Sequence, residues 1–140
     1  VGIPILMQGV RGYAGTLTEA LARQDRSFTE TENAAHRTDH AVVGALVART
    51  WRMPTPIYQA VRLHHDFSAL DDSRLDKEVR MLVAMSLVAE HLVNMFEGVK
   101  EQREWSLHGK ACLAHLAVVS DELEGWMDAL HGAFESVSVH

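Results

Sequence analysis

The sequence predicts an all-α fold, and three observations support this prediction. Apolar residues recur at helical spacing along most of the 140 residues. No stretch shows the sustained period-two alternation, bounded by turn residues, that is typical of β-strands. Helix start and stop signals, such as Ser27, Asp39 and Pro54, divide the chain into segments with short connections. We therefore expect a single domain over residues 1–140, built as an irregular array of about six or seven helices.

Glycines and polar residues separate the first segments of the chain. Ile3–Gln8 is a short apolar piece that Gly9 and Gly12 interrupt. Four residues after it repeat at helical spacing: Tyr13, Leu17, Ala20 and Leu21. The hydroxyl of Ser27 is suited to cap a helix over Phe28–His36. These features predict a short first piece followed by two helices.

Two further helices are expected before the middle of the chain. Asp39 is a start signal for a helix over His40–Arg52, which should stop there because proline disfavours helix at the residue before it. Pro54 and the proline two residues later suit the first turn of another helix, which runs to about Asp66. A polar loop over Phe67–Ser73 should follow.

The second half of the chain begins with its longest expected element. Leu75–Glu97 is apolar on two sides, which indicates a central helix sandwiched between neighbours, and Gly98 should close it. A further helix is marked by Cys112, Leu113, Leu116 and Val119. Ser120 should cap the last helix, whose apolar stripe is Leu123, Trp126, Met127, Leu130 and Phe134. The clean stripe favours a core position for Trp126.

Composition and charge exclude several classes of function. Apolar residues make up 47% of the chain and the formal net charge is −6, without the basic stripe that binding to nucleic acid requires. Cys112 is the single cysteine, so neither an internal disulfide nor a cysteine-based zinc site is expected. No uninterrupted apolar run approaches the ~18 residues of a membrane span. We expect a cytoplasmic protein that contacts neither nucleic acid nor membrane.

Nine histidines are many for a chain of this length, and three of them share a pattern. His40 lies on the same helical face as Gly44, and His64 lies on the apolar face of the next helix with His65 at its edge. Two consecutive helices therefore direct imidazoles toward one interior. A single inward histidine is usually a core residue with a backbone or carboxylate partner. A constellation also fits a present or ancestral site for a divalent metal.

Three segments carry a resemblance to a known family. Thr38–Leu46 has the sequence TDHAVVGAL, Trp51–Pro54 is WRMP, and Ile57–Asp66 is IYQAVRLHHD. In this order and separation they resemble the D-H-A-x-V-G-A, W-x-x-P and A-[IV]-x-x-H-H motifs of the HDOD family. The resemblance is firmest over about Glu30 to Ser68, and farther along the chain it rests on the helical pattern.

The resemblance implies a fold like that of the HD and HD-GYP phosphohydrolases. Those enzymes hold metal ions with an H…HD…H…HH…D set of ligands. In this comparison His40 matches the third histidine, and His64 and His65 match the HH pair, with Asp66 beside them. These four residues are the candidates for a remnant HD site or a ligand pocket.

Three departures from the enzyme pattern argue against catalysis. Val1-Gly2 would match the x-G of the H-D-x-G-K motif, which places Ile3 where the enzymes have a catalytic lysine. The last metal-binding aspartate would fall near Ser86, and Phe67–Leu70 replaces the G-Y-P signature. Under this alignment the chain is the C-terminal part of the domain, and we expect its first helices upstream of Val1. We expect no catalytic residue, no bound metal and no cofactor.

The resemblance favours a bacterial signal-transduction output or regulatory module that acts through a protein partner, without catalysis, as in response regulators. Homodimerisation is left open, and exposed aromatic residues such as Trp105, Trp126 or Phe134 are candidates for the partner surface. One alternative is a metal-dependent phosphohydrolase, similar to cyclic-dinucleotide phosphodiesterases, whose other ligands lie upstream of Val1. The second alternative is a nucleotide-binding receptor, although no glycine-rich phosphate loop supports it.

Overall fold

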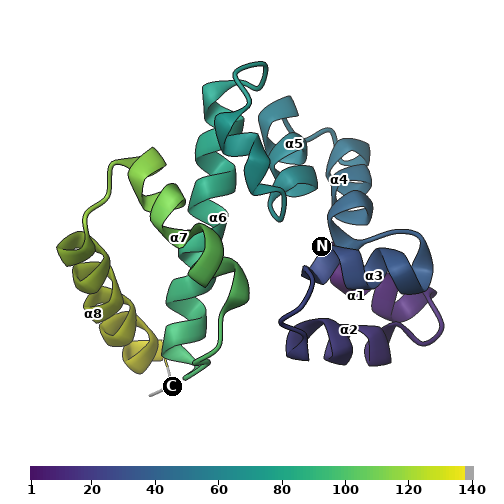
Figure 1. Ribbon diagram of the computed structural model, residues 1–140, viewed down its shortest axis with the longest axis horizontal. Coiled ribbons are helices and arrows are strands. Elements are labelled where there is room, and N and C mark those ends of the chain that lie inside the picture. Colours follow the sequence, from purple (N-terminus) through teal and green to yellow (C-terminus); the bar gives the residue numbers. More distant parts are fainter. Residues whose placement is uncertain (138–140) are drawn as a thin grey trace. The chain divides into compact units, whose positions relative to one another are not determined.

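The computed structural model describes residues 1–137, and all regular secondary structure in this part of the chain is helical (Figure 1). The predicted all-α fold is confirmed. The described residues form eight α-helices and one 3₁₀ helix, slightly more than the six or seven expected. The chain divides into two compact units, Val1–Val83 and Ala84–His140. That residues 1–140 form one domain stays a prediction.

Six helical elements belong wholly to the N-terminal unit. They are α1 (Gly2–Gly9), α2 (Tyr13–Ala22), α3 (Phe28–His36), α4 (His40–Thr50), α5 (Thr55–Leu63) and the 3₁₀ helix η1 (Phe67–Asp71). The apolar piece expected at Ile3–Gln8 is thus a helix of its own, which raises the count. It ends at Gly9, and Gly12 adopts the left-handed conformation, with φ of 82°, just before α2. Within this unit α4 packs against both α1 and α5, and α2 packs against α3.

The predicted start signals of α3 and α4 are confirmed. Ser27 and Glu30 form a capping box, in which Glu30 N donates to Ser27 Oγ over 3.2 Å and Ser27 N donates to Glu30 Oε2 over 2.6 Å. Asp39 caps α4 by accepting a hydrogen bond from the backbone N–H of Val42 at 2.8 Å. These caps fix the register of both helices, and with it the direction in which their inward side chains point.

The segment after α5 differs from the expected polar loop. Helix α5 ends at Leu63 rather than near Asp66, and the 3₁₀ helix η1 follows at Phe67–Asp71. Phe67 and Leu70 are buried, so this short element contributes to the core. Five residues are too few to show a periodicity, which is why the sequence did not reveal the 3₁₀ helix.

The longest helix is α6, Lys77–Phe96, close to the predicted Leu75–Glu97. The boundary between the two units falls within it, after Val83, so its predicted central position stays a prediction. Its buried residues are Val79, Val83, Ala84, Leu87, Val88 and Leu92. By length and composition alone α6 could also cross a membrane, with a mean hydropathy of 1.4 over its most apolar window. Core helices of soluble proteins pass this test too.

Aromatic contacts connect the helices of the C-terminal unit. Trp105 of α7 (Arg103–Leu116) stacks on His91 of α6 with ring centroids 3.7 Å apart. Phe134 of α8 (Ser120–Val137) lies against Phe96 of α6 at 4.7 Å. Gly109 makes room for Trp105, because a Cβ at this position would lie 2.6 Å from the indole ring. His140 lies outside the described residues.

The expected core position of Trp126 is wrong. This side chain is 43% exposed, and α8 contains no fully buried residue. Three other members of the predicted stripe, Leu123, Met127 and Leu130, are half-buried. The stripe therefore identifies the inward face of α8, and Trp126 lies at the edge of that face. Periodicity gives the direction of a side chain but not the depth to which its helix is covered.

The single cysteine allows a direct test of core packing in the C-terminal unit. Cys112 is fully buried in α7, and burial raises the pKa of its thiol to about 11. Since only the thiolate is alkylated readily, and about one thiol in a thousand is ionised three pH units below the pKa, we expect almost no reaction with iodoacetamide at about pH 8. In denaturing urea labelling should be complete, as measured by mass spectrometry. Fast labelling of the folded chain would contradict the buried position.

Candidate functional site

Three of the four candidate residues meet at one point of the N-terminal unit. His40 is the first residue of α4, and His64 and His65 follow the last residue of α5. Nε2 of His40 lies 3.1 Å from Nε2 of His64 and 3.0 Å from Nε2 of His65. One ring nitrogen from each of the three lies within 4.8 Å of the others. We call these three residues the imidazole cluster.

Local structure fixes the orientation of each ring in the cluster. Nδ1 of His64 lies 2.7 Å from the carbonyl oxygen of Val61, one turn earlier in α5. The ring of His65 lies parallel to that of Phe28, with 5.9 Å between their centroids, and the edge of His40 meets the same phenyl ring at 5.1 Å. The first residue of α3 therefore forms one wall of the cluster.

Glu32 of α3 belongs to this site, although sequence reasoning missed it. Its side chain is fully buried, and its carboxylate accepts hydrogen bonds from the Tyr13 hydroxyl, from the His40 backbone N–H at 3.2 Å and from His40 Nδ1 at 2.7 Å. Burial and the neighbouring carboxylate raise the pKa of Tyr13 well above its ordinary value, so its hydroxyl stays a donor. The only sequence signal for Glu32 was its spacing of one turn from Phe28.

The hydrogen bonds determine which nitrogens face the centre of the cluster. A carbonyl oxygen can only accept, so Nδ1 of His64 carries a proton, and Nδ1 of His40 donates to the carboxylate of Glu32. The Nε2 atoms of both rings then face each other with lone pairs unless a proton or a metal ion lies among them. Their separation of 3.1 Å is close to the ~3.3 Å between two tetrahedral ligands placed ~2.05 Å from a zinc ion. A carboxylate behind His40 is also the usual partner of a metal-binding imidazole.

Comparison with protein families finds an HDOD domain over residues 1–67. This part of the chain belongs to the HDOD family. The resemblance predicted from the three motifs is thereby confirmed, and the matched segment contains the whole imidazole cluster together with Glu32. An HDOD match over residues 1–67 indicates an HD-related signalling module in this segment. Searches of curated proteins and of solved structures found no match.

The residues described in this HDOD segment do not fit the two-metal centre of the HD phosphohydrolases. Such a centre needs carboxylates that bridge or anchor the ions. Glu32 lies behind His40, on the Nδ1 side, and its oxygens already accept three donors. Asp66 is exposed and caps η1, accepting from Ser68 N at 3.2 Å and Ser68 Oγ at 2.6 Å. The cluster could therefore hold one ion with three neutral ligands, but it brings no carboxylate oxygen to its centre.

The glycine aligned with the HD motif also lies at this site. Gly2 opens α1 so close to α4 that a Cβ there would lie 1.9 Å from the carbonyl oxygen of His40. Ile3, which the resemblance aligns with the catalytic lysine of the enzymes, follows it and is half-buried. Ser86 belongs to the C-terminal unit. The HDOD segment thus places Gly2 in close backbone contact with α4, and it contains no lysine.

Proposed function

We propose that the chain is a non-catalytic regulatory module of bacterial signal transduction, which works in the cytoplasm by binding a protein partner. The observation that carries this proposal is the set of hydrogen bonds that the Glu32 carboxylate accepts. The most deeply buried carboxylate among the described residues, that of Glu32, accepts hydrogen bonds from the backbone and side chains of its own unit. A catalytic carboxylate would instead have to face a metal ion, a water molecule or a substrate.

The network around Glu32 suits a rigid scaffold. Tyr13, Glu32 and His40 connect α2, α3 and α4 through buried hydrogen bonds, and His64 places the end of α5 against His40. A satisfied buried network of this kind fixes one arrangement of helices, which a module needs if it presents a constant surface to a partner. The HDOD match supports the same conclusion, because the family resembles the HD enzymes in fold and is generally regarded as non-catalytic.

A metal-dependent phosphohydrolase is the second candidate, and the geometry of the imidazole cluster favours it. Three ring nitrogens at metal-ligand spacing are an efficient site for a single borderline cation. In this reading His40, His64 and His65 would hold the ion, and carboxylates outside the described cluster would have to complete the centre. We rank it below the regulatory module because neither Asp66 nor Glu32 faces the cluster centre.

A metal and turnover assay separates these two candidates. We expect no hydrolysis of a cyclic dinucleotide or of bis(p-nitrophenyl) phosphate above the buffer rate, with manganese, iron(II) or zinc present. Metal content is measured on the same samples, with His64→Ala as the test variant and His115→Ala in α7 as the matched control. One bound ion without turnover would agree with the proposal, since a lone ion at three imidazoles can act as a structural cross-link. Turnover that His64→Ala abolishes and His115→Ala preserves would overturn it.

A further inference from the structure

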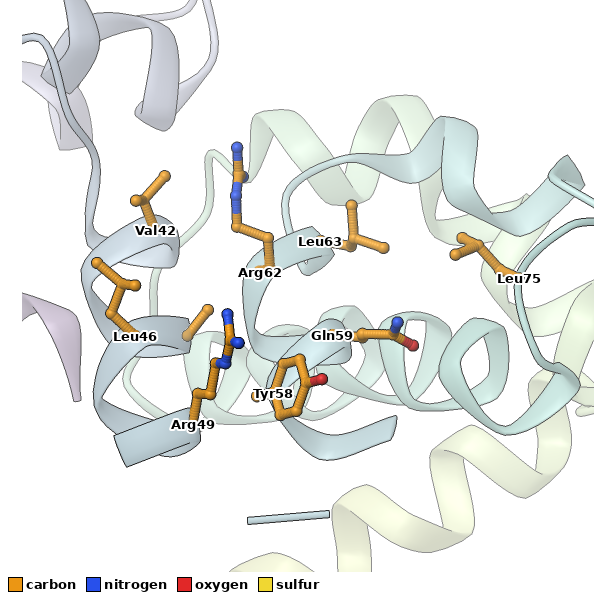
Figure 2. A pocket seen from close by; sticks show the side chains of 9 residues that line it. Val42, Leu46, Arg49, Tyr58, Gln59, Arg62, Leu63 and Leu75 are labelled. Atoms are coloured by element: carbon orange, nitrogen blue, oxygen red, sulfur yellow. The ribbon is translucent and has the colours of Figure 1, made fainter. Parts of the chain in front are cut away.

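A groove lies between α4 and α5, outside the imidazole cluster. Its volume is about 300 Å³. Figure 2 shows side chains of α4 along one side and side chains of α5 along the other. The apolar part of its lining is Val42, Ala45, Leu46, Leu63 and Leu75, with the ring of Tyr58. All of these residues belong to the N-terminal unit.

Two arginines, Arg49 of α4 and Arg62 of α5, lie beside this apolar lining (Figure 2). Both are exposed, and neither forms an ion pair within residues 1–137. Three other arginines of the same unit, Arg23, Arg26 and Arg74, each lie 2.6–3.4 Å from a carboxylate oxygen. What sets Arg49 and Arg62 apart from the remaining arginines is that both line one apolar groove. In a chain of net charge −6, the groove is thus a local region of unpaired positive charge around an apolar floor.

We propose that this groove binds an acidic amphipathic helix of a protein partner. Carboxylates of the partner would pair with the guanidinium groups of Arg49 and Arg62, whose planar fork suits two-point contact with a carboxylate. Apolar side chains spaced one turn apart on the same helix would fill the space between α4 and α5, the usual mode of helix-in-groove recognition. The inference rests on the proposed function and names the chemistry of the partner that the module binds.

The shape of the groove favours a polypeptide over a small ligand. A volume of about 300 Å³ is at the lower end for small-molecule pockets, and it matches one or two large side chains. The apolar surface also continues outward, because Leu46 at the groove edge is 59% exposed. An enclosed ligand would leave this edge in water, whereas a helix laid along α4 would cover it.

Binding of a labelled synthetic peptide tests the proposal on the whole chain. The probe is a fluorescein-labelled helical peptide with a leucine and a phenylalanine one turn apart, flanked by glutamates; its control has lysines in place of the glutamates. We expect binding with a Kd on the order of 10–100 µM for the acidic peptide, at least about tenfold weaker binding of the lysine peptide, and a similar loss for the double variant R49E/R62E. The variant K100E/K110E changes the net charge equally at exposed sites elsewhere and should bind within about twofold of the wild type.

Backbone amide shifts of α4 and α5 in NMR spectra locate the bound peptide, and circular dichroism checks that each variant is folded. Equal binding by R49E/R62E, or shifts confined to other helices, would overturn the proposal.

Decanoate binding at least as tightly as the peptide would assign the groove to a small amphipathic anion instead. A dimer that R49E/R62E dissociates in sedimentation would assign it to a second copy of the chain. Phosphodiesterase turnover that His64→Ala abolishes would contradict the proposed non-catalytic function. It would not affect the conclusion about peptide binding, because Arg49 and Arg62 lie outside the imidazole cluster.

Discussion

Replacing Glu32 with alanine is expected to lower the free energy of unfolding of the N-terminal unit by about 3–5 kcal/mol. The substitution leaves three buried donors without an acceptor, namely the Tyr13 hydroxyl and the backbone N–H and Nδ1–H of His40. It also opens a cavity at a fully buried position. The change is measured by urea unfolding followed by circular dichroism, with hydrogen exchange of the α3 and α4 amides to localise it.

A graded series makes this expectation specific to the hydrogen bonds. Glu32→Gln keeps the shape of the side chain and one carbonyl oxygen. Its free energy of unfolding should therefore lie between those of the wild type and the alanine variant, about 1–3 kcal/mol below the wild type. Glu124→Ala, on the exposed surface of α8, removes a carboxylate of the same type and should change the free energy of unfolding only slightly. If the alanine variant does not fold, the glutamine variant still reports on the network. A loss below about 1 kcal/mol for Glu32→Ala would mean that the carboxylate is not an important connection between helices.

The sequence contained enough information to predict four of the five α-helices of the HDOD segment, α2 to α5, and its three inward histidines. Helix caps act through side chains adjacent in sequence, so Ser27 and Asp39 could be recognised without any knowledge of the fold. The direction of His40 and His64 followed from helical periodicity, because each lies on an apolar face. Family motifs then linked the two positions. These predictions depend on residues within about two helical turns of each other.

Glu32 and the groove could not be predicted in the same way, because both depend on contacts between helices. Glu32 lies in the polar stretch Phe28–His36, where a buried carboxylate and an exposed one look alike. Its burial is favourable only because Tyr13 and His40 bring donors from two other helices. The unpaired state of Arg49 likewise becomes visible only once the positions of all carboxylates are known. For Trp126 the sequence predicted the correct helix face but not the extent of burial, because the side chain is largely exposed.

The imidazole cluster and the groove share the same two helices. His40 opens α4 while His64 and His65 follow α5, and the groove is lined by later turns of α4 and by α5. Contacts at the cluster therefore fix the angle between the two helices whose other residues form the groove. Under the proposal that the groove binds a partner, the histidines of an HD-type site would position the binding surface, which would connect the retained residues of the HDOD segment with the regulatory role.

Replacing Gly2 with alanine is the second substitution with a large expected effect, because it forces α1 away from α4. A Cβ at this position would lie 1.9 Å from the carbonyl oxygen of His40 and 2.7 Å from its carbonyl carbon, and backbone atoms cannot move aside as a flexible side chain can. We expect a loss of about 2 kcal/mol or more in the free energy of unfolding, together with faster hydrogen exchange in α1, whose Leu6 is buried.

Gly9 provides the matched control within the same helix. A Cβ there would meet no atom within 4 Å, so Gly9→Ala should be neutral or stabilising by up to about 1 kcal/mol through helix propensity. Gly44→Ala should fall between the two, since its Cβ would lie 3.1 Å from the Val61 side chain and 3.3 Å from the backbone nitrogen of Gly2. If Gly2→Ala proved as harmless as Gly9→Ala, the close approach of α1 to the start of α4 would be wrong. The destabilisation by alanine, expected to decrease in the order Gly2, Gly44, Gly9, thus measures how closely the backbone of α1 packs beside the imidazole cluster.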